Sequence, residues 1–201
     1  MIDATILIPT FRHAALLLYS VRSALDQADA TVEVFVVGDG VEDDTRAALE
    51  PFADDERVRF FDFPKGARHG ELNRHEALHE ATGEIVCYLS DDDLLLRDHA
   101  AAMRLLLENA DFAHSISARL ELAGTIEYFP WNLSRPEFVE VGLNRKASIG
   151  LTGTAHTPRR IAGSRSAGER LRWVGRPITT CGASGSSSPA FAAQWESDSR
   201  T

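Results

Sequence analysis

Short apolar runs alternate with segments of helical periodicity over the first 115 residues, and this alternation constrains the fold more than any other feature. The strand-like runs are rich in β-branched residues and lie at 5–9, 32–37, 58–63, 85–89 and 112–116. Apolar residues spaced three and four apart lie between them, at 14–25, 43–49, 71–81 and 97–108. Strands separated by helices predict βαβ units, so we expect an α/β domain with a mostly parallel sheet flanked by helices. Gly83 follows the third helical segment, and we expect it to end that helix as its C′ residue.

Composition narrows the class of protein. The chain has 201 residues, 44% of them hydrophobic, which is enough to bury a core without disulfides. Two cysteines, Cys87 and Cys181, are too few for a disulfide framework or a cysteine zinc cluster. Cys87 lies inside an apolar strand-like run, so we expect a buried thiol in a reducing compartment. No apolar run reaches the roughly 18 residues of a membrane span, so we expect no transmembrane segment.

Charge is distributed unevenly along the chain. Residues 1–158 carry 14 basic and 27 acidic residues, a net charge of −13, whereas residues 159–201 carry seven basic and three acidic residues, a net charge of +4. The overall charge of −9 argues against nonspecific binding to nucleic acid, so we expect no nucleic-acid partner. The tail is rich in Ser, Gly and Arg and shows no sustained apolar periodicity. We therefore expect residues 159–201 to be poorly packed, and the C-terminal part of the fold to be incomplete or disordered.

Polar residues follow several of the expected strands. Asp39 ends the second strand, and the acidic run Asp91–Asp93 follows the fourth. Ligands of parallel sheets bind beyond the carboxyl ends of the strands, which meet at one edge. Adjacent aspartates at a strand end favour a divalent cation, and hard oxygen ligands suit Mg²⁺ or Mn²⁺. The alternative is a simple helix cap, because carboxylates are favoured before a helix N-terminus.

Four motifs in order resemble the family-2 glycosyltransferases, which have the Rossmann-like GT-A fold. The motifs are Ile8-Pro9-Thr10-Phe11, Val36–Asp43, Gly66 to Arg74, and Ala81-Thr82-Gly83-Glu84-Ile85 leading to Asp91-Asp92-Asp93. The resemblance is close over residues 4–115 and looser over 116–157. It implies an inverting, metal-assisted transfer of a sugar from a nucleotide-diphosphate sugar to an acceptor hydroxyl.

The resemblance also implies roles for individual residues. Thr10 and Asp39 would hold the base and ribose, and Arg74 would face the diphosphate. The full expected donor site is Pro9, Thr10, Arg12, Asp39, Arg74 and Asp91. Asp92 and Asp91 would hold Mn²⁺ or Mg²⁺, with His156 as an additional candidate ligand. Such a transfer needs a general base, and the residues before 158 offer no convincing one, so the base is left unassigned.

Some positions depart from the family pattern. Gly38 and Val41 replace an Asp and a Ser of the family's Asp-Asp-Gly-Ser motif. Ser90 stands where the first carboxylate of the family's acidic motif falls, so fewer carboxylates than usual are available for the metal. His75 stands where the family often has Asn. These departures bear on metal affinity rather than on the fold.

We expect one nucleotide-sugar-binding domain at 1–157, with a donor half at 1–115 and a partial acceptor half at 116–157, followed by the tail at 159–201. The chain has 19 Arg and two Lys, which indicates GC-rich codons. When residues 160–184 are back-translated and read from the third base of each codon, one permitted string begins Y-R-R-L-P and contains T-D-x-x-M-W. We therefore hypothesise a frameshifted C-terminus. The alternative is a genuine Arg/Ser-rich tail, and the coding DNA distinguishes the two.

Three other function classes make different demands on the sequence. The segment His75-Glu76-Ala77-Leu78-His79 matches the H-E-x-x-H pattern of zinc hydrolases. A sugar nucleotidyltransferase would need a Gly-rich N-terminal loop, which Ile8–Arg12 lacks. A third reading is a nucleotide-binding relic that has lost its base. The acceptor is open among glycans, lipids and proteins, and we expect a cytoplasmic location, with association at the membrane periphery left open.

Overall fold

The computed structural model describes residues 1–129, 132–133, 135–143, 150–158, 176–181 and 187–193. It divides into two compact units, Met1–Arg104 and Leu105–Thr201. The hypothesis of a frameshift concerns a segment that lies largely outside the described residues. None of the described helices is both long enough and apolar enough to cross a bilayer.

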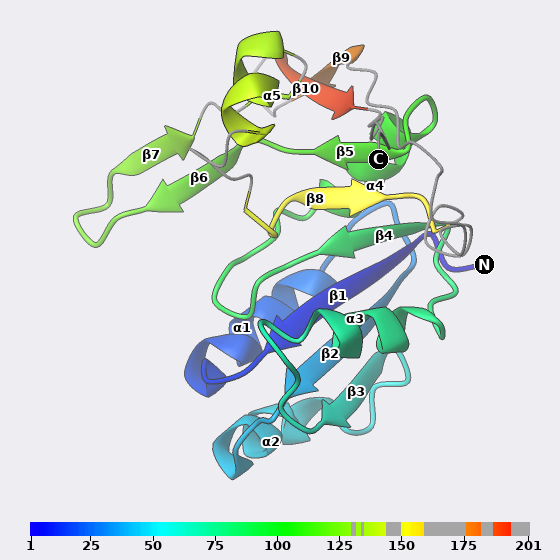
Figure 1. Ribbon diagram of the computed structural model, residues 1–201, viewed down its shortest axis with the longest axis vertical. Coiled ribbons are helices and arrows are strands. Elements are labelled where there is room, and N and C mark those ends of the chain that lie inside the picture. The colour runs from blue at the N-terminus through cyan, green and yellow to red at the C-terminus, as the bar shows by residue number, and fades with distance from the viewer. Residues whose placement is uncertain (130–131, 134, 144–149, 159–175, 182–186, 194–201) are drawn as a thin grey trace, which may run out of the picture. The chain divides into compact units, whose positions relative to one another are not determined.

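The first unit is built on four parallel strands. They are β1 (Ala4–Thr10), β2 (Val32–Asp39), β3 (Val58–Phe63) and β4 (Ile85–Tyr88). Their spatial order is β3-β2-β1-β4, with Thr10 of β1 opposite Gly38 of β2 (Figure 1). The expected strands and their parallel pairing are confirmed. Because β1 lies in the middle, the residues that follow it are placed between the ends of β2 and β4.

Helices cover both faces of these strands. They are α1 (Ala14–Leu25), α2 (Asp43–Leu49), a short 3₁₀ turn at Glu50–Phe52, α3 (Glu71–Leu78) and α4 (His99–Leu107). In Figure 1, α3 lies in front of the sheet and α1 behind it. Ala77 of α3 is buried with Leu7 and Val37, and aromatic residues of β3 pack around this cluster. On the other side, Leu17 and Val21 of α1 are fully buried. Burial of these apolar side chains on two faces stabilises the layered α/β unit.

The end of α3 corrects one expectation. The helix stops at Leu78, three residues before the expected end, and Gly83 does not cap it. A Cβ at Gly83 would lie 2.3 Å from the amide nitrogen of Thr5, so only glycine allows this backbone to approach β1. The Gly83 amide donates to Thr5 Oγ1 (3.1 Å) and to Glu33 Oε1 (3.2 Å). Gly83 is therefore a packing glycine at the entrance to β4.

Cys87 lies at the centre of β4 and is fully buried, as expected. Burial raises the pKa of its thiol to about 12. Such a group stays protonated at neutral pH and acts as a small apolar side chain.

The second unit is antiparallel where the structure describes it. Its strands are β5 (Phe112–His114), β6 (Ser117–Leu120), β7 (Ile126–Phe129), β8 (Thr154–His156), β9 (Arg176–Cys181) and β10 (Ser187–Ala193), and its helix is α5 (Pro136–Leu143). The order β8-β5-β10-β9 joins four of these strands, and β6 pairs with β7 as a separate hairpin. Segments 176–181 and 187–193 of the tail thus form strands, and the expectation of poor packing there remains a prediction.

Candidate functional site

Asp39 is the most heavily hydrogen-bonded carboxylate at the carboxyl edge of the parallel strands. It ends β2 and is 7% exposed. Its Oδ1 accepts from the Gly66 amide (2.6 Å) and from Asn73 Nδ2 (2.9 Å), and its Oδ2 accepts from Lys65 Nζ. Burial alone would raise the pKa of Asp39, but the bonds from Lys65 and Gly66 outweigh it and hold the pKa below its usual value. A carboxylate offers about four acceptor positions, so one remains for a further donor.

Two glycines allow the chain to close around this carboxylate. Gly40 and Gly70 both have left-handed backbones, with φ of +73° and +71°. A Cβ at Gly40 would lie 2.7 Å from Lys65 Cβ, and a Cβ at Gly70 would lie 2.7 Å from Asp39 Cγ. Glycine is required at both positions by conformation and by space. The loop at 64–70, between β3 and α3, is therefore shaped around Asp39.

The second cluster lies beyond β1 and β4 and joins an imidazole to two carboxylates. His13 Nδ1 lies 2.9 Å from Asp91 Oδ1, and one donor atom each of His13, Asp91 and Asp92 fall within 4.8 Å of one another. Asp91 is 7% exposed, whereas Asp92 is exposed. The hydrogen bond to Asp91, assisted by the charges of Asp91 and Asp92, raises the pKa of His13. Nitrogen and oxygen donors in this arrangement can hold a divalent cation.

Phe11 connects the two clusters. Its amide points to Asp91 Oδ2 at 3.4 Å, and Lys65 Nζ lies 5.0 Å from the centre of its ring. Because Lys65 also binds Asp39, a continuous series of contacts runs from Asp39 through Lys65 and Phe11 to Asp91. All of these residues belong to the first unit. Sequence reasoning placed Asp39 and Asp91 at one edge of the sheet, and in the structure Lys65 and Phe11 connect them there.

Thr10 places a buried hydroxyl group at the carboxyl end of β1. It is 3% exposed, and its Oγ1 has no partner among the described residues. A buried hydroxyl without a partner costs free energy unless a ligand or water completes it. The contact of Thr10 with a nucleotide remains a prediction.

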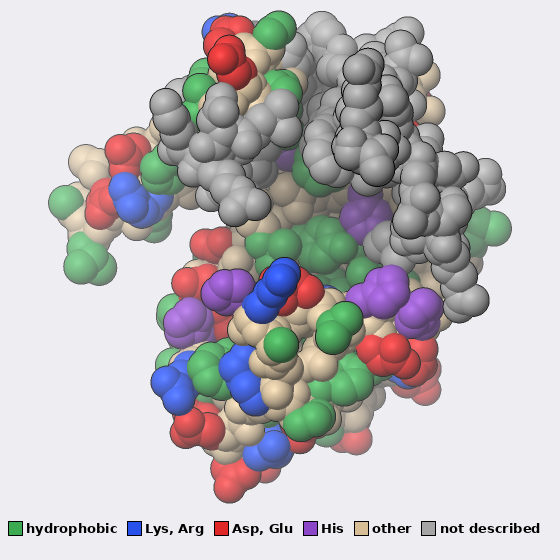
Figure 2. Space-filling view, viewed as in Figure 1, with side chains coloured by type: hydrophobic (Ala, Val, Ile, Leu, Met, Phe, Trp, Pro, Cys, Tyr) green, Lys and Arg blue, Asp and Glu red, His purple; other side chains and the backbone are tan. Residues whose placement is uncertain are grey.

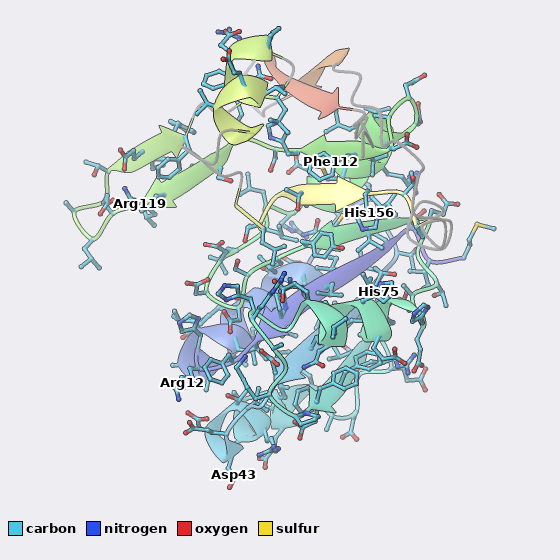
Figure 3. All side chains as sticks on the ribbon, in the orientation of Figure 1. Arg12, Asp43, His75, Phe112, Arg119 and His156 are labelled. Carbon is cyan, nitrogen blue, oxygen red and sulfur yellow. The ribbon has the colours of Figure 1, made fainter. Side chains whose placement is uncertain are left out.

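The remaining expected donor-site residues lie on the same unit. Pro9 lies in β1 opposite Val37, and Arg12 is exposed with its guanidinium 4.6 Å from the Phe11 ring centre. Figure 3 shows Arg12 beside the start of α1. Arg74 on α3 donates to the His69 carbonyl (3.1 Å). The contacts of Pro9, Arg12 and Arg74 with a nucleotide remain predictions.

Figure 2 shows charged side chains of both signs over the described part of the face that it displays. Among the ion pairs of the first unit, Arg46 binds Asp43 (2.8 Å) and Asp62 (2.9 Å). Exposed pairs of this kind contribute little to stability. Lys65 differs because its partner Asp39 is buried, and its side chain is therefore held at the edge of the sheet.

His156, the additional metal candidate, lies on β8 in the second unit opposite Phe112 (labelled in Figure 3). Its Nδ1 lies 3.1 Å from the Thr157 carbonyl, and burial lowers the pKa of its ring. Its participation in a metal site stays a prediction. Sequence reasoning missed the contact of His13 with Asp91, which no local motif marks because the two residues are 78 positions apart in the chain.

The H-E-x-x-H segment lies on and just after α3. The rings of His75 and His79 contact each other edge to face with centres 4.8 Å apart, and both side chains are exposed. The group of three or more donors found among the described residues is His13, Asp91 and Asp92, which includes neither of them. The three-ligand site of a zinc hydrolase is thus not assembled in the part of the chain that the structure describes.

Comparison with known proteins gives the family. The model of Glycosyl transferase family 2 matches residues 5–160. The GalNAc(5)-diNAcBac-PP-undecaprenol beta-1,3-glucosyltransferase of Campylobacter jejuni is 30% identical over 149 residues, which are 72% of this chain and 45% of that enzyme. The chain therefore spans less than half the length of this curated relative.

Two solved structures show a weaker likeness. TarS of S. aureus, in complex with UDP-GlcNAc, is 21% identical with a TM-score of 0.49, covering 55% of this chain and 33% of TarS. The mannosyltransferase PcManGT of Pyrobaculum calidifontis, in complex with GDP-Man and Mn²⁺, is 27% identical with a TM-score of 0.47, covering 59% of this chain and 38% of that enzyme. The family model, by contrast, covers well over half of the sequence, and on that match the chain belongs to glycosyl transferase family 2.

Proposed function

We propose that this chain transfers a sugar from a nucleotide-diphosphate sugar to an acceptor hydroxyl, with inversion at the sugar carbon. The observation that carries the proposal is the continuous series of contacts from Asp39 to Asp91 across the carboxyl ends of β2, β1 and β4. Ligands of parallel α/β sheets bind at this edge. Membership in family 2 supports the reaction class.

The nucleoside would be held near Asp39 and Thr10. The free acceptor position of Asp39 suits an N–H or O–H of a base or ribose, and the buried Thr10 hydroxyl gains a partner when a ligand is bound. Lys65 and the Gly66 amide fix the carboxylate in place before the ligand arrives. Fixed donors and acceptors of this kind bind with a smaller entropy cost than mobile ones.

A divalent ion, Mn²⁺ or Mg²⁺, would be held by Asp92 and Asp91. The oxygen donors of these two carboxylates fit such ions, and His156 is proposed as an additional ligand. When bound, the ion supplies charge neutralisation for the leaving nucleoside diphosphate. Asp91 also accepts the Phe11 amide, a bond that orients its carboxylate. Arg74 is proposed to bind the diphosphate from α3 through its guanidinium.

The acceptor is proposed to be a saccharide on a lipid carrier. The support is the name of the Campylobacter relative, a glucosyltransferase whose acceptor is linked to undecaprenol through a diphosphate. An acceptor of this kind resides in a membrane, so the proposal places the protein at the cytoplasmic membrane periphery. Deprotonation of the acceptor hydroxyl needs a general base, and a chain without one would bind nucleotides but transfer no sugar.

A transfer assay separates these outcomes. The whole chain is incubated with UDP-, GDP- or dTDP-sugars, Mn²⁺ and a polyprenyl-diphosphate saccharide, and the anomeric configuration of the product is read by NMR. The proposal expects one donor to be consumed, with inversion of its anomeric centre. Retention would contradict the inverting mechanism. Tight nucleotide binding without any product would identify the chain as a nucleotide-binding relic.

A further inference from the structure

We propose that His13 is a third protein ligand of the ion and makes the site selective for Mn²⁺-like transition metals over Mg²⁺. This inference rests on the metal site of the proposed function and adds a residue to it. The relevant side chains are His13, in the loop between β1 and α1, and Asp91 and Asp92, in the loop after β4. The two loops lie next to each other because β1 and β4 are neighbours in the sheet.

The geometry brings the three donors almost to coordination distance. His13 Nδ1 and Asp91 Oδ1 are 2.9 Å apart, and all three donor atoms lie within 4.8 Å of one another. Two ligands of one ion, bound at about 2.1 Å each, can be at most about 4.2 Å apart. Asp92 and His13 are both exposed, so their side chains have room to rotate towards a shared ion. When the ion binds, it takes the place of the proton that lies between His13 and Asp91.

His13 has no competing structural role in the described contacts of its side chain. It occupies the N-cap position of α1, but its side chain makes no capping hydrogen bond. A residue selected for the helix would be Ser, Thr, Asp or Asn at that position. The imidazole is instead directed to Asp91 while half of it remains exposed. An accessible imidazole that contacts a carboxylate is available to a metal.

The chemistry of the donor set predicts the selectivity. Mg²⁺ prefers oxygen ligands in a strict octahedron, whereas Mn²⁺, Co²⁺ and Zn²⁺ accept an imidazole nitrogen. Two carboxylates alone would serve either kind of ion. An additional imidazole ligand from His13 raises the affinity for the transition metals and changes the affinity for Mg²⁺ little. The ratio of Mn²⁺ to Mg²⁺ affinity is therefore the quantity that His13 controls.

The test uses metal alone, without nucleotide. Free Mn²⁺ is titrated with the full chain and followed by its EPR signal, and Mg²⁺ is then added as a competitor. His13→Gln keeps a polar side chain of similar length but replaces the nitrogen donor with an amide. We expect Mn²⁺ affinity to fall about tenfold or more, and Mg²⁺ affinity to change by less than about threefold. His79→Gln is the matched control, since His79 is exposed and lies outside the group of three donors, and we expect it to leave both affinities unchanged.

A spectroscopic measurement keeps the inference testable if the variant folds poorly. Electron spin-echo modulation of Mn²⁺ bound to the wild type should show coupling to an imidazole ¹⁴N. Either of two results would overturn the role of His13 alone. One is Mn²⁺ binding to the wild type without nitrogen coupling, and the other is an unchanged ratio of Mn²⁺ to Mg²⁺ affinity in a folded His13→Gln chain. The proposed function fails separately, if nucleoside diphosphates do not bind. A wild type that binds no Mn²⁺, even with UDP or GDP present, would overturn both the His13 inference and the metal site.

Discussion

Gly70 lies directly against Asp39: a Cβ on Gly70 would come within 2.7 Å of the Asp39 carboxyl carbon. The left-handed backbone of Gly70, with φ of +71°, makes this approach possible. The loop that supplies Gly66 and Gly70, and the first turn of α3 that supplies Asn73, are therefore fitted to one carboxylate. The geometry of the candidate nucleotide site therefore depends on the absence of a side chain at position 70.

Gly70→Ala should destabilise the fold more than the same substitution at a left-handed glycine with free space around its Cβ position. The backbone conformation alone costs about 1–2 kcal/mol in a non-glycine residue. The contact with the buried Asp39 adds to this, so we expect a total loss of about 2–4 kcal/mol. Gly124→Ala is the control, because Gly124 has φ of +80° but nothing within 4 Å of its Cβ position. Urea unfolding measures both losses, and equal losses would show that Asp39 does not constrain Gly70.

Thr10→Val should lower nucleotide affinity without lowering the stability of the fold. The variant removes a buried hydroxyl without a partner, so stability should be unchanged or higher by up to about 1 kcal/mol. Nucleotide affinity should fall about fivefold because one hydrogen bond to the ligand is lost. Thr5→Val is the comparison, since the Thr5 hydroxyl donates to Glu33 (2.6 Å) and accepts from Gly83. It should cost about 1–2 kcal/mol. A destabilised Thr10→Val chain with unaltered nucleotide binding would contradict the assignment.

Lys65→Met should lower the free energy of unfolding most at neutral pH. The pKa of Asp39 is lowered in the folded state, so its carboxylate contributes stability above about pH 4 that is lost as pH falls through the lowered value. Removal of Lys65 should raise that pKa and cost about 1–3 kcal/mol at pH 7. Arg46→Met removes only exposed ion pairs and should cost less than about 1 kcal/mol. The comparison is made by urea unfolding at pH 7 and pH 3. Similar losses in the two variants would argue against a special role for the Lys65–Asp39 pair.

His99→Leu should reduce the sensitivity of the fold to acid. His99 is 8% exposed, its Nε2 has no partner among the described residues, and burial lowers its pKa to about 4. The unfolded chain takes up this proton near pH 6.5, so stability falls as pH drops from about 6.5 to about 4, by about 2–4 kcal/mol. Without the imidazole this loss should disappear, whereas His79→Leu, at an exposed position, should leave it intact. An unchanged pH profile of the melting temperature in His99→Leu would refute the prediction.

Much of the fold follows from the sequence because buried parallel strands have a strong local signal. The runs that became β1, β2 and β3 are apolar, β-branched and bounded by Pro, Gly or Asp, and the structure places strands there with bounds that differ by at most two residues. The match of the family model confirms the membership expected from the ordered motifs, and with it the GT-A fold class. Gly83 was misread because the backbone approach that requires it involves β1, about 80 residues away in sequence.

The candidate site was predicted only in part, for the same reason. Asp39 and Asp91 were found because each follows a strand, and parallel strand ends meet at one edge. Lys65 and His13 were missed because their roles arise from contacts across 26 and 78 residues, which no periodicity reports. The contacts of loop residues of this kind can be inferred only when the strand order is known.

The most direct test of the account is a thermal melt of the full chain with UDP, GDP or dTDP, each with and without Mn²⁺. It is made on the wild type, on Asp92→Ala and on Asp54→Ala, an exposed aspartate in a turn that serves as the control. The account predicts that one nucleotide raises the melting temperature, that Mn²⁺ increases the rise, and that only Asp92→Ala loses the effect of the metal. A cooperative melt that no nucleotide shifts, with or without Mn²⁺, would contradict the central claim that this edge of the sheet binds a nucleotide-diphosphate sugar.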